Sequence, residues 1–377
     1  MPRIRPAALW QARRIGPHCL HLLPQCRDLR SAQNELRWMT EHSIKISQQV
    51  GLKTHRHLLE SYVSRRAQGE PLQYILESQF FGALEIRCRP GVLIPREETA
   101  ASVTHLVKIL SIEQDRSSAL RVLDLCTGTG CIPLLFHHEF YAERPRTNTA
   151  LEIVGIDVSG VALSIARENL IHRIADQSNV GDDSVARRRS LQRIGFVQAD
   201  VLNTTANGAT SDPPPILEAL ERLQLDDGRD DFDILIANPP YISPQEFQRT
   251  TSRSVRMFEP PLALVPSSLP TMSDVEIGDR FYPRLLELAL QVGVKIVLFE
   301  VADMAQAQRV ASLMTKQGIW DEIEIWRDEP GEGSLLDENA RLGDTDVKVR
   351  GSGNGRSVFA RRQRSPSTPG SVTVHEQ

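Results

Sequence analysis

Four short apolar runs, each followed by a glycine-rich or polar segment, constrain the fold of this chain most strongly. They span residues 120–125, 151–156, 195–199 and 234–237. Apolar runs of this length are typical of strands buried inside a sheet. After Asp157, apolar residues recur at helical spacing, so strands and helices alternate. The pattern predicts an open α/β sheet.

The residues that follow the first three runs are suited to binding a ligand. The first run leads into Cys126-Thr-Gly-Thr-Gly130, a turn whose glycines let the backbone approach a ligand closely. The second run ends in Asp157, a residue placed to accept ribose hydroxyls. The third ends in Asp200, which can accept from an adenine amine. Each Asp taken alone is a helix cap or a turn residue, but three such ends in succession favour a shared site.

The fourth run ends in Asn238-Pro-Pro-Tyr241. Two prolines prevent the strand from continuing, so Asn238 lies where a strand gives way to a rigid loop. In open α/β sheets, ligands bind at this edge. The Asn side chain and the adjacent main-chain carbonyls are neutral acceptors that suit a substrate NH2 group. The alternative is a turn in which Asn tolerates unusual backbone angles.

These segments together resemble those of class I, S-adenosylmethionine-dependent methyltransferases. Within that class the chain closely resembles the HemK-type protein-glutamine N(5)-methyltransferases, which modify the Gly-Gly-Gln motif of peptide-chain release factors. The resemblance covers most of residues 65 to 305 and a closing strand near Val358. Its specific part is Ile94-Pro-Arg-x-Glu-Thr99 together with Asn-Pro-Pro-Tyr, and further matching segments are residues 69–75, 258–264, 278–282 and 298–301.

The resemblance implies a Rossmann-like, seven-stranded, mostly parallel sheet with a small N-terminal helical domain. We expect a mitochondrial presequence in residues 1–28, a helical substrate-recognition domain in 29–75, a catalytic domain in 76–362 and a disordered tail in 363–377. Polar or Gly-rich composition marks three stretches as insertions or linkers, which are residues 176–189, 203–231 and 326–355.

The resemblance also assigns site residues. It implies binding of S-adenosylmethionine by Cys126, Thr127, Gly128, Thr129, Gly130, Asp157, Asp200, Val201 and Asn238, and it implies a catalytic role for Asn238, Pro239, Pro240 and Tyr241. Asn238 and the Pro239 carbonyl would accept from the substrate nitrogen, and Tyr241 would form an aromatic wall. Arg96, Glu98 and Glu259 would brace the loop or meet the substrate. Cys126 departs from the family, which has glycine there, so its Cβ can crowd the ligand.

The first 27 residues contain five arginines and no acid, with apolar residues between them. This basic, amphipathic composition is typical of a mitochondrial presequence. A disordered basic tail and a first helix of the fold are the alternatives. From about Ala32 to Arg66 the apolar spacing is helical.

Net charge, the length of the apolar runs and the spacing of cysteines and histidines argue against several kinds of function. A net charge of -4 and a pI near 6.2 argue against a general nucleic-acid binder, and no apolar run is long enough to cross a bilayer. Five cysteines without Cys-x-x-Cys spacing, and histidines without a second cluster, predict no metal site.

We therefore expect N5-methylation of the Gly-Gly-Gln glutamine of a mitochondrial release factor, with that protein as partner and neither nucleic acid nor membrane. One alternative is an adenine or guanine amino-methyltransferase, for which the Arg187-Arg-Arg189 run is the only basic feature. The other is an inactive protein with the same fold. Cys126 favours it, while Asp157 and Asn238 speak against it.

Overall fold

A computed structural model describes residues 4–112, 119–143, 149–177, 185–204, 213–223, 231–332, 338–342 and 345–362. Its centre is a nine-stranded sheet in the order β5-β4-β3-β6-β7-β11-β8-β10-β9. The strands are β3 (Leu120–Leu125), β4 (Leu151–Asp157), β5 (Gly195–Gln198), β6 (Ile234–Ala237), β7 (Ile296–Glu300), β8 (Glu322–Glu329), β9 (Glu338–Leu342), β10 (Thr345–Arg350) and β11 (Ser352–Arg361).

The five strands from β5 to β7 run parallel, so their carboxyl ends meet at one edge of the sheet. Every residue of β3, β6 and β7 is buried, which explains why these runs lack alternation. β11 is antiparallel to both of its neighbours, β7 and β8. The α/β class and the mostly parallel sheet are as predicted.

The sheet is larger than the seven strands expected from the sequence. β10 pairs with β8 and β9 pairs with β10, which extends the sheet beyond the expected edge. Residues 326–355, interpreted as an insertion or a linker, thus contribute to the sheet, which contradicts a linker and leaves the alternative of an insertion. In β10, buried Val347 and Val349 alternate with more exposed residues, and this period-2 pattern is that of a half-buried strand. The neighbouring glycines obscured it.

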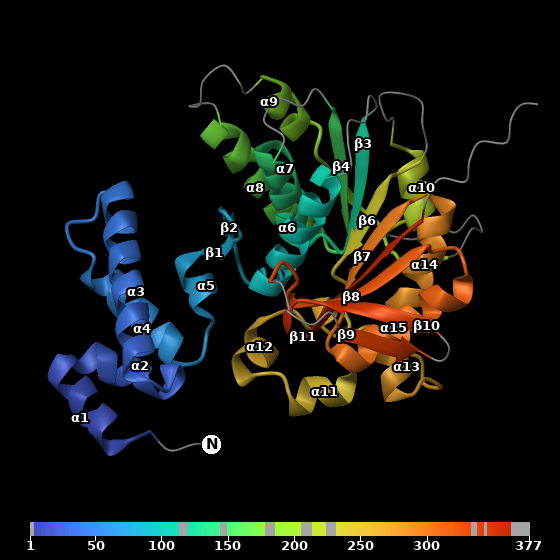
Figure 1. Cartoon of the computed structure of the whole chain (residues 1–377). Coiled ribbons are helices and arrows are strands. Elements are labelled where there is room, and N and C mark those ends of the chain that lie inside the picture. Colours follow the sequence, from blue (N-terminus) through green and yellow to red (C-terminus); the bar gives the residue numbers. More distant parts are fainter. Residues whose placement is uncertain are drawn as a thin grey trace, which may run out of the picture.

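Helices cover both faces of the sheet (Figure 1). On one face the apolar side chains of α6 (Glu97–Ile112), α7 (Cys131–Glu143) and α8 (Gly160–Gln177) form one core with the strands. On the other face α10 (Ile216–Glu221), α14 (Phe281–Gln291) and α15 (Met304–Gln317) form a second core. The remaining short elements are α9 (Val185–Gln192), α11 (Pro244–Arg249), α12 (Arg253–Phe258), η2 (Pro261–Ala263) and α13 (Asp274–Gly278).

The N-terminal helices pack around a core of their own. They are α1 (Pro6–Ile15), α2 (Pro17–Cys26), α3 (Leu29–Gln49), α4 (Arg56–Ala67) and α5 (Leu72–Leu76). Within the expected presequence, Ala12, Cys19, Leu22 and Leu23 are completely buried in that core. The Gln25 side chain also donates to the Ala67 carbonyl at 3.1 Å. Residues 6–26 are thus built into this helical unit.

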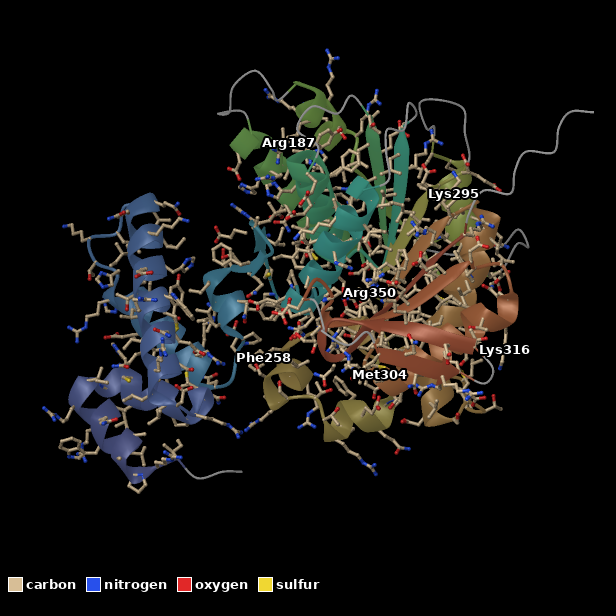
Figure 2. All side chains as sticks on the ribbon, in the orientation of Figure 1. Arg187, Phe258, Lys295, Met304, Lys316 and Arg350 are labelled. Atoms are coloured by element: carbon tan, nitrogen blue, oxygen red, sulfur yellow. The ribbon has the colours of Figure 1, made fainter. Side chains whose placement is uncertain are left out.

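A short hairpin and α12 join the helical unit to the sheet. The hairpin strands are β1 (Ser78–Phe81) and β2 (Leu84–Arg87), which pair in antiparallel fashion. Phe258 on α12, labelled in Figure 2, packs against buried Tyr74, Cys88 and Ile94. The Ser254 hydroxyl donates to the Gly69 carbonyl at 2.6 Å. These contacts attach residues 69–94, which link the helical unit to the sheet, to the segment that follows Asn-Pro-Pro-Tyr.

The described ranges of the chain bear on two further expectations, that of no membrane-spanning segment and that of no metal site. No helix there is long and apolar enough to cross a membrane. No group of three His, Cys, Asp or Glu side chains in those ranges could hold a metal ion, and the five cysteines are free. The tail expected to be disordered, residues 363–377, lies outside the described ranges.

Candidate active site

The turn after β3 is tight because three of its residues adopt positive φ. These are Cys126 at 63°, Gly128 at 55° and Gly130 at 73°. A Cβ on Gly130 would lie 2.8 Å from the Phe196 ring and 3.0 Å from Ala166, so only glycine fits there. The turn is closed by the Gly130 N–H, which donates to the Thr127 carbonyl at 2.9 Å.

Cys126 is the non-glycine residue in this left-handed conformation, which strains an L-residue. The residue is half-buried and lines a cavity at the carboxyl edge of the sheet. Burial, together with nearby Asp157, Asp124 and Asp200, raises the pKa of this thiol well above its ordinary value. The thiol is therefore neutral and a weak nucleophile at physiological pH.

Asp157 at the end of β4 is bonded to the neighbouring turn. One carboxylate oxygen accepts from the Gly128 N–H at 2.9 Å, and the other accepts from the Ser159 N–H at 2.8 Å. Burial raises the pKa of this carboxyl, and the backbone donors oppose that shift. Each oxygen keeps a further lone pair, so a diol can bind while both internal bonds persist.

Asp200 follows β5, and Val201 beside it is 4% exposed. One oxygen of Asp200 accepts from the Leu202 N–H at 2.8 Å, which is the local turn bond that such a residue often makes. Both residues also line the cavity. The local turn role and a ligand-binding role are therefore compatible.

Asn238 comes directly after β6 and is half-buried, followed by buried Pro239 and Pro240. Its Nδ2 donates to the Thr99 hydroxyl oxygen at 3.3 Å. Within the part of the chain that the structure describes, no donor reaches Oδ1. The amide thus has one satisfied side and one free acceptor.

Tyr241 differs from the expected aromatic wall because it does not line the cavity. Its hydroxyl donates to Glu300 Oε1 at 3.0 Å, and its carbonyl accepts from the Gln306 side chain at 3.2 Å. Both partners lie outside the cavity lining, and both contacts hold the loop in place. Pro239 and Gly130 also lie outside the cavity lining, the glycine because it packs against Phe196.

One cavity of about 370 Å³ brings the other predicted site residues together at the carboxyl edge of the sheet. Ligand pockets typically measure roughly 300–1,000 Å³. Predicted residues that line it are Cys126, Thr127, Gly128, Thr129, Asp157, Asp200, Val201, Asn238 and Pro240. Apolar residues complete the wall, among them Ile94, Pro260, Leu262, Ala263 and Phe281.

Arg96, Glu98 and Glu259 divide into different roles. Glu259 is buried and accepts from the Ile94 N–H at 3.1 Å and from Arg96 at 2.8 Å. It therefore braces the segment on which Arg96 lies, and Arg96 itself lines the cavity. Glu98 is partly exposed and is not among the lining residues.

Sequence reasoning missed three residues. Asp124 in β3 is completely buried, and neither carboxylate oxygen has a hydrogen-bond partner within the described ranges. Burial raises its pKa to about 8. A carboxylate inside an otherwise apolar strand was the available signal. Thr99 and Glu300 lie in segments that match the family, residues 94–99 and 298–301, but sequence reasoning assigned neither of them a role because their contacts with Asn238 and Tyr241 join distant segments.

Several curated proteins are similar to this chain. The mitochondrial MRF1 N(5)-glutamine methyltransferase MTQ1 of Saccharomyces cerevisiae is 33% identical over 269 residues, covering 70% of this chain and 68% of that protein. The probable MRF1 mitochondrial N(5)-glutamine methyltransferase mtq1 of Schizosaccharomyces pombe is 32% identical, covering 83% and 89%. The release factor glutamine methyltransferase of Nitratidesulfovibrio vulgaris is 31% identical, covering 73% and 74%. No protein-family model matches the chain.

The parallel sheet, the glycine-rich turn after β3 and the cavity at the carboxyl edge define a class I methyltransferase of the S-adenosylmethionine-dependent type. Together with these relatives, they place the chain more narrowly. It belongs to the release factor glutamine methyltransferases.

Proposed function

We propose that this protein transfers a methyl group from S-adenosylmethionine to the side-chain nitrogen of the glutamine in the Gly-Gly-Gln motif of a mitochondrial release factor. The observation that carries the proposal is the state of Asn238. Its NH2 group is bonded to Thr99, and its oxygen has no donor within the described residues. It borders the same cavity as Asp157 and the glycine-rich turn.

The residues present fit the methyl donor. When bound, S-adenosylmethionine supplies an electrophilic methyl group on a sulfonium. Asp157 would accept from the ribose hydroxyls through its remaining lone pairs. Asp200 and Val201 would border the adenine, and the turn from Cys126 to Gly130 the methionine part. Asp124 is completely buried and does not line the cavity, so we assign it no contact with the donor.

Asn238 and Pro239 would orient the substrate. A glutamine nitrogen shares its lone pair with its own carbonyl, so it attacks a methyl group poorly. The Asn238 oxygen would accept one N–H bond at the cavity wall, and the carbonyl of the adjacent Pro239, which is not part of the cavity lining, would accept the other. Together they would direct the lone pair to the methyl carbon. As the N–C bond formed, the methyl–sulfur bond of the donor would break and leave a neutral thioether, and the positive charge that developed on nitrogen would be bound more strongly by both acceptors. One N–H proton then leaves to solvent.

The two prolines and Tyr241 would keep these acceptors in place. Pro240 restricts Pro239 to extended geometry and contributes no N–H that could compete for the site. Tyr241 anchors the far end of the loop through Glu300. We therefore assign Tyr241 a supporting role within the catalytic loop.

The helical unit is the proposed contact region for the release factor. Trp38, Ile44, Val50 and Leu52 expose apolar side chains at the surface of or just beyond α3. Exposed apolar side chains on one unit are available for contact with a protein partner. With a net charge of -4, the chain gives no general attraction for nucleic acid, so we propose a protein partner.

We further propose a mitochondrial location. The acid-free, basic N-terminal segment supports it, as do the two yeast relatives whose names include the word mitochondrial. Because α1 and α2 contribute completely buried side chains to the helical core, we propose that these helices stay in the imported protein. Residues 29–75 alone would lack part of that core.

Incubation with a labelled methyl donor tests the substrate class. A release factor, its isolated Gly-Gly-Gln domain and total mitochondrial RNA are offered separately. The proposal expects label on the release factor and its domain, at the glutamine, and none on RNA. Label on RNA alone would replace the protein substrate with a nucleic acid.

A further inference from the structure

Glu300 accepts hydrogen bonds from two segments of the active site that are far apart in the sequence. It is the last residue of β7 and is 4% exposed. Its Oε2 accepts from the Thr99 hydroxyl at 2.5 Å, and its Oε1 accepts from the Tyr241 hydroxyl at 3.0 Å. One carboxylate therefore connects the first turn of α6 with the loop that carries Asn238.

These contacts have a fixed direction. A hydroxyl has a single proton, and an ionised carboxylate can only accept. Because Thr99 gives its proton to Glu300, its oxygen can only accept from Asn238, as the 3.3 Å contact from Nδ2 shows. The amide group carries NH2 and oxygen on opposite sides. With NH2 directed to Thr99, the oxygen is left as the group available for another ligand.

We propose that Glu300, acting through Thr99, is a positioning residue that sets the orientation of the Asn238 amide and thereby makes the site select a substrate NH2 group. This inference rests on the proposed function, in which Asn238 accepts from the glutamine nitrogen. A reversed amide would direct NH2 at the substrate NH2, and two donors would then face each other without an acceptor.

A purely structural role for Glu300 predicts a different outcome. Its backbone carbonyl accepts from the Tyr282 hydroxyl at 2.9 Å, so it also contributes to the packing of the sheet edge. If packing were its whole role, a neutral isostere would lower stability or affect all ligands alike. If direction is its role, the isostere changes transfer to the amide and leaves the methyl-donor site intact.

The substitution Glu300→Gln separates these roles because it preserves shape and supplies a donor. The new NH2 can donate to Thr99, which frees the Thr99 proton for the Asn238 oxygen and reverses the amide. We expect a fall in kcat of about 100-fold or more, with donor Kd changed less than about three-fold. Thr99→Val should lose as much, whereas Thr99→Ser, which keeps the hydroxyl, should retain activity within about five-fold.

The double variant gives an internal check. Thr99→Val removes the middle of the hydrogen-bond relay, by which we mean the series Glu300, Thr99 and Asn238. Adding Glu300→Gln to it should then lower kcat by less than about three-fold more, since the effects of residues that act in series are not additive. Glu324→Gln is the matched control: Glu324 is a buried carboxylate on β8 that accepts from the Trp326 indole at 2.9 Å. Its kcat should equal that of the wild type even if its stability falls.

A readout independent of the methylated substrate keeps the two proposals apart. In the wild type bound to the methyl donor, the Asn238 side-chain amide protons should show nuclear Overhauser contacts with Thr99, and Glu300→Gln should abolish them. Loss of these contacts supports the relay even if the release factor is not methylated, an outcome that would count only against the proposed function. The positioning role of Glu300 would be overturned by a wild-type kcat in Glu300→Gln, by additive losses of kcat in the double variant, or by unchanged amide contacts of Asn238.

Discussion

The main-chain N–H of Gly128 donates to the carboxylate of Asp157 across 2.9 Å, and this bond ties the glycine-rich turn to the end of the adjacent strand. The two residues are 29 positions apart, yet β3 and β4 are neighbours in the sheet. One carboxylate therefore shapes the turn and offers lone pairs to the cavity. Loss of Asp157 should disturb both at once.

We predict that Asp157→Ala weakens binding of the methyl donor by about 1–3 kcal/mol, the range for losing hydrogen bonds to a charged group. Isothermal titration calorimetry measures this directly. Asp176→Ala, at an exposed position on α8, is the control and should bind as the wild type does. Unchanged affinity in Asp157→Ala would place the ribose contact elsewhere.

Cys126→Gly should stabilise the protein. The residue has φ of 63°, a conformation that costs an L-residue roughly 1–2 kcal/mol, and glycine avoids this at some cost in chain entropy. We expect the free energy of unfolding to rise by about 1 kcal/mol and donor affinity to stay equal or increase. Denaturant unfolding compares it with Cys126→Ala, which keeps the strain and should show no gain. A large loss of affinity in the glycine variant would mean that the thiol itself supports the donor.

The rate of methyl transfer should fall at low pH. Burial raises the pKa of Glu300 above its usual 4.5, while Thr99, Arg356 and Tyr241 oppose the rise and Glu98 adds to it. A protonated Glu300 can donate, which removes the constraint on the relay. The activity that depends on the ionised form is thus present above this raised pKa and lost as pH falls through it.

The measurement is the pH profile of kcat at saturating donor. The wild type should show an acid limb with a midpoint above 4.5. Glu300→Gln has no proton to gain, so its residual rate should lack that limb. An identical limb in both proteins would assign the titration to another group.

The N-terminal segment should serve both import and folding. Residues 1–35 fused to a fluorescent protein should enter mitochondria because the segment is basic and free of acids up to Asp28. Deletion of residues 1–28 should lower the melting temperature, since it uncovers the apolar side chains of α3 and α4 that α1 and α2 bury. Cytosolic fluorescence would refute the import role, and an unchanged melting temperature would refute the structural one.

The strand ends could be predicted because each is encoded locally. Asp157, Asp200 and Asn238 each follow an apolar run, and parallel strands bring their carboxyl ends to one edge. The helical spacing after Asp157 likewise predicted α8. What these patterns do not contain is the arrangement of side chains from distant segments.

The relay around Asn238 is such an arrangement. Thr99 lies 139 positions from Asn238 and 201 from Glu300, and no pattern in a single sequence pairs them. The last strands were missed for another reason: glycines within residues 326–355 suggested an insertion or a linker, although the alternating valines of β10 indicated a strand. Tyr241 was expected at the ligand because its bond to Glu300 could not be foreseen.

The central claim is that Asn238 selects a glutamine NH2 and directs methyl transfer to it. The measurement is mass spectrometry of two release factors, one with Gly-Gly-Gln and one with Gly-Gly-Glu, after incubation with the enzyme and labelled donor. We predict one methyl group on the glutamine nitrogen and none on the glutamate protein, because the carboxylate has no N–H and repels the carbonyl acceptors. Asn238→Ala should methylate the glutamine protein about 100- to 10,000-fold more slowly. Equal labelling of both release factors, or wild-type turnover by Asn238→Ala, would contradict the account.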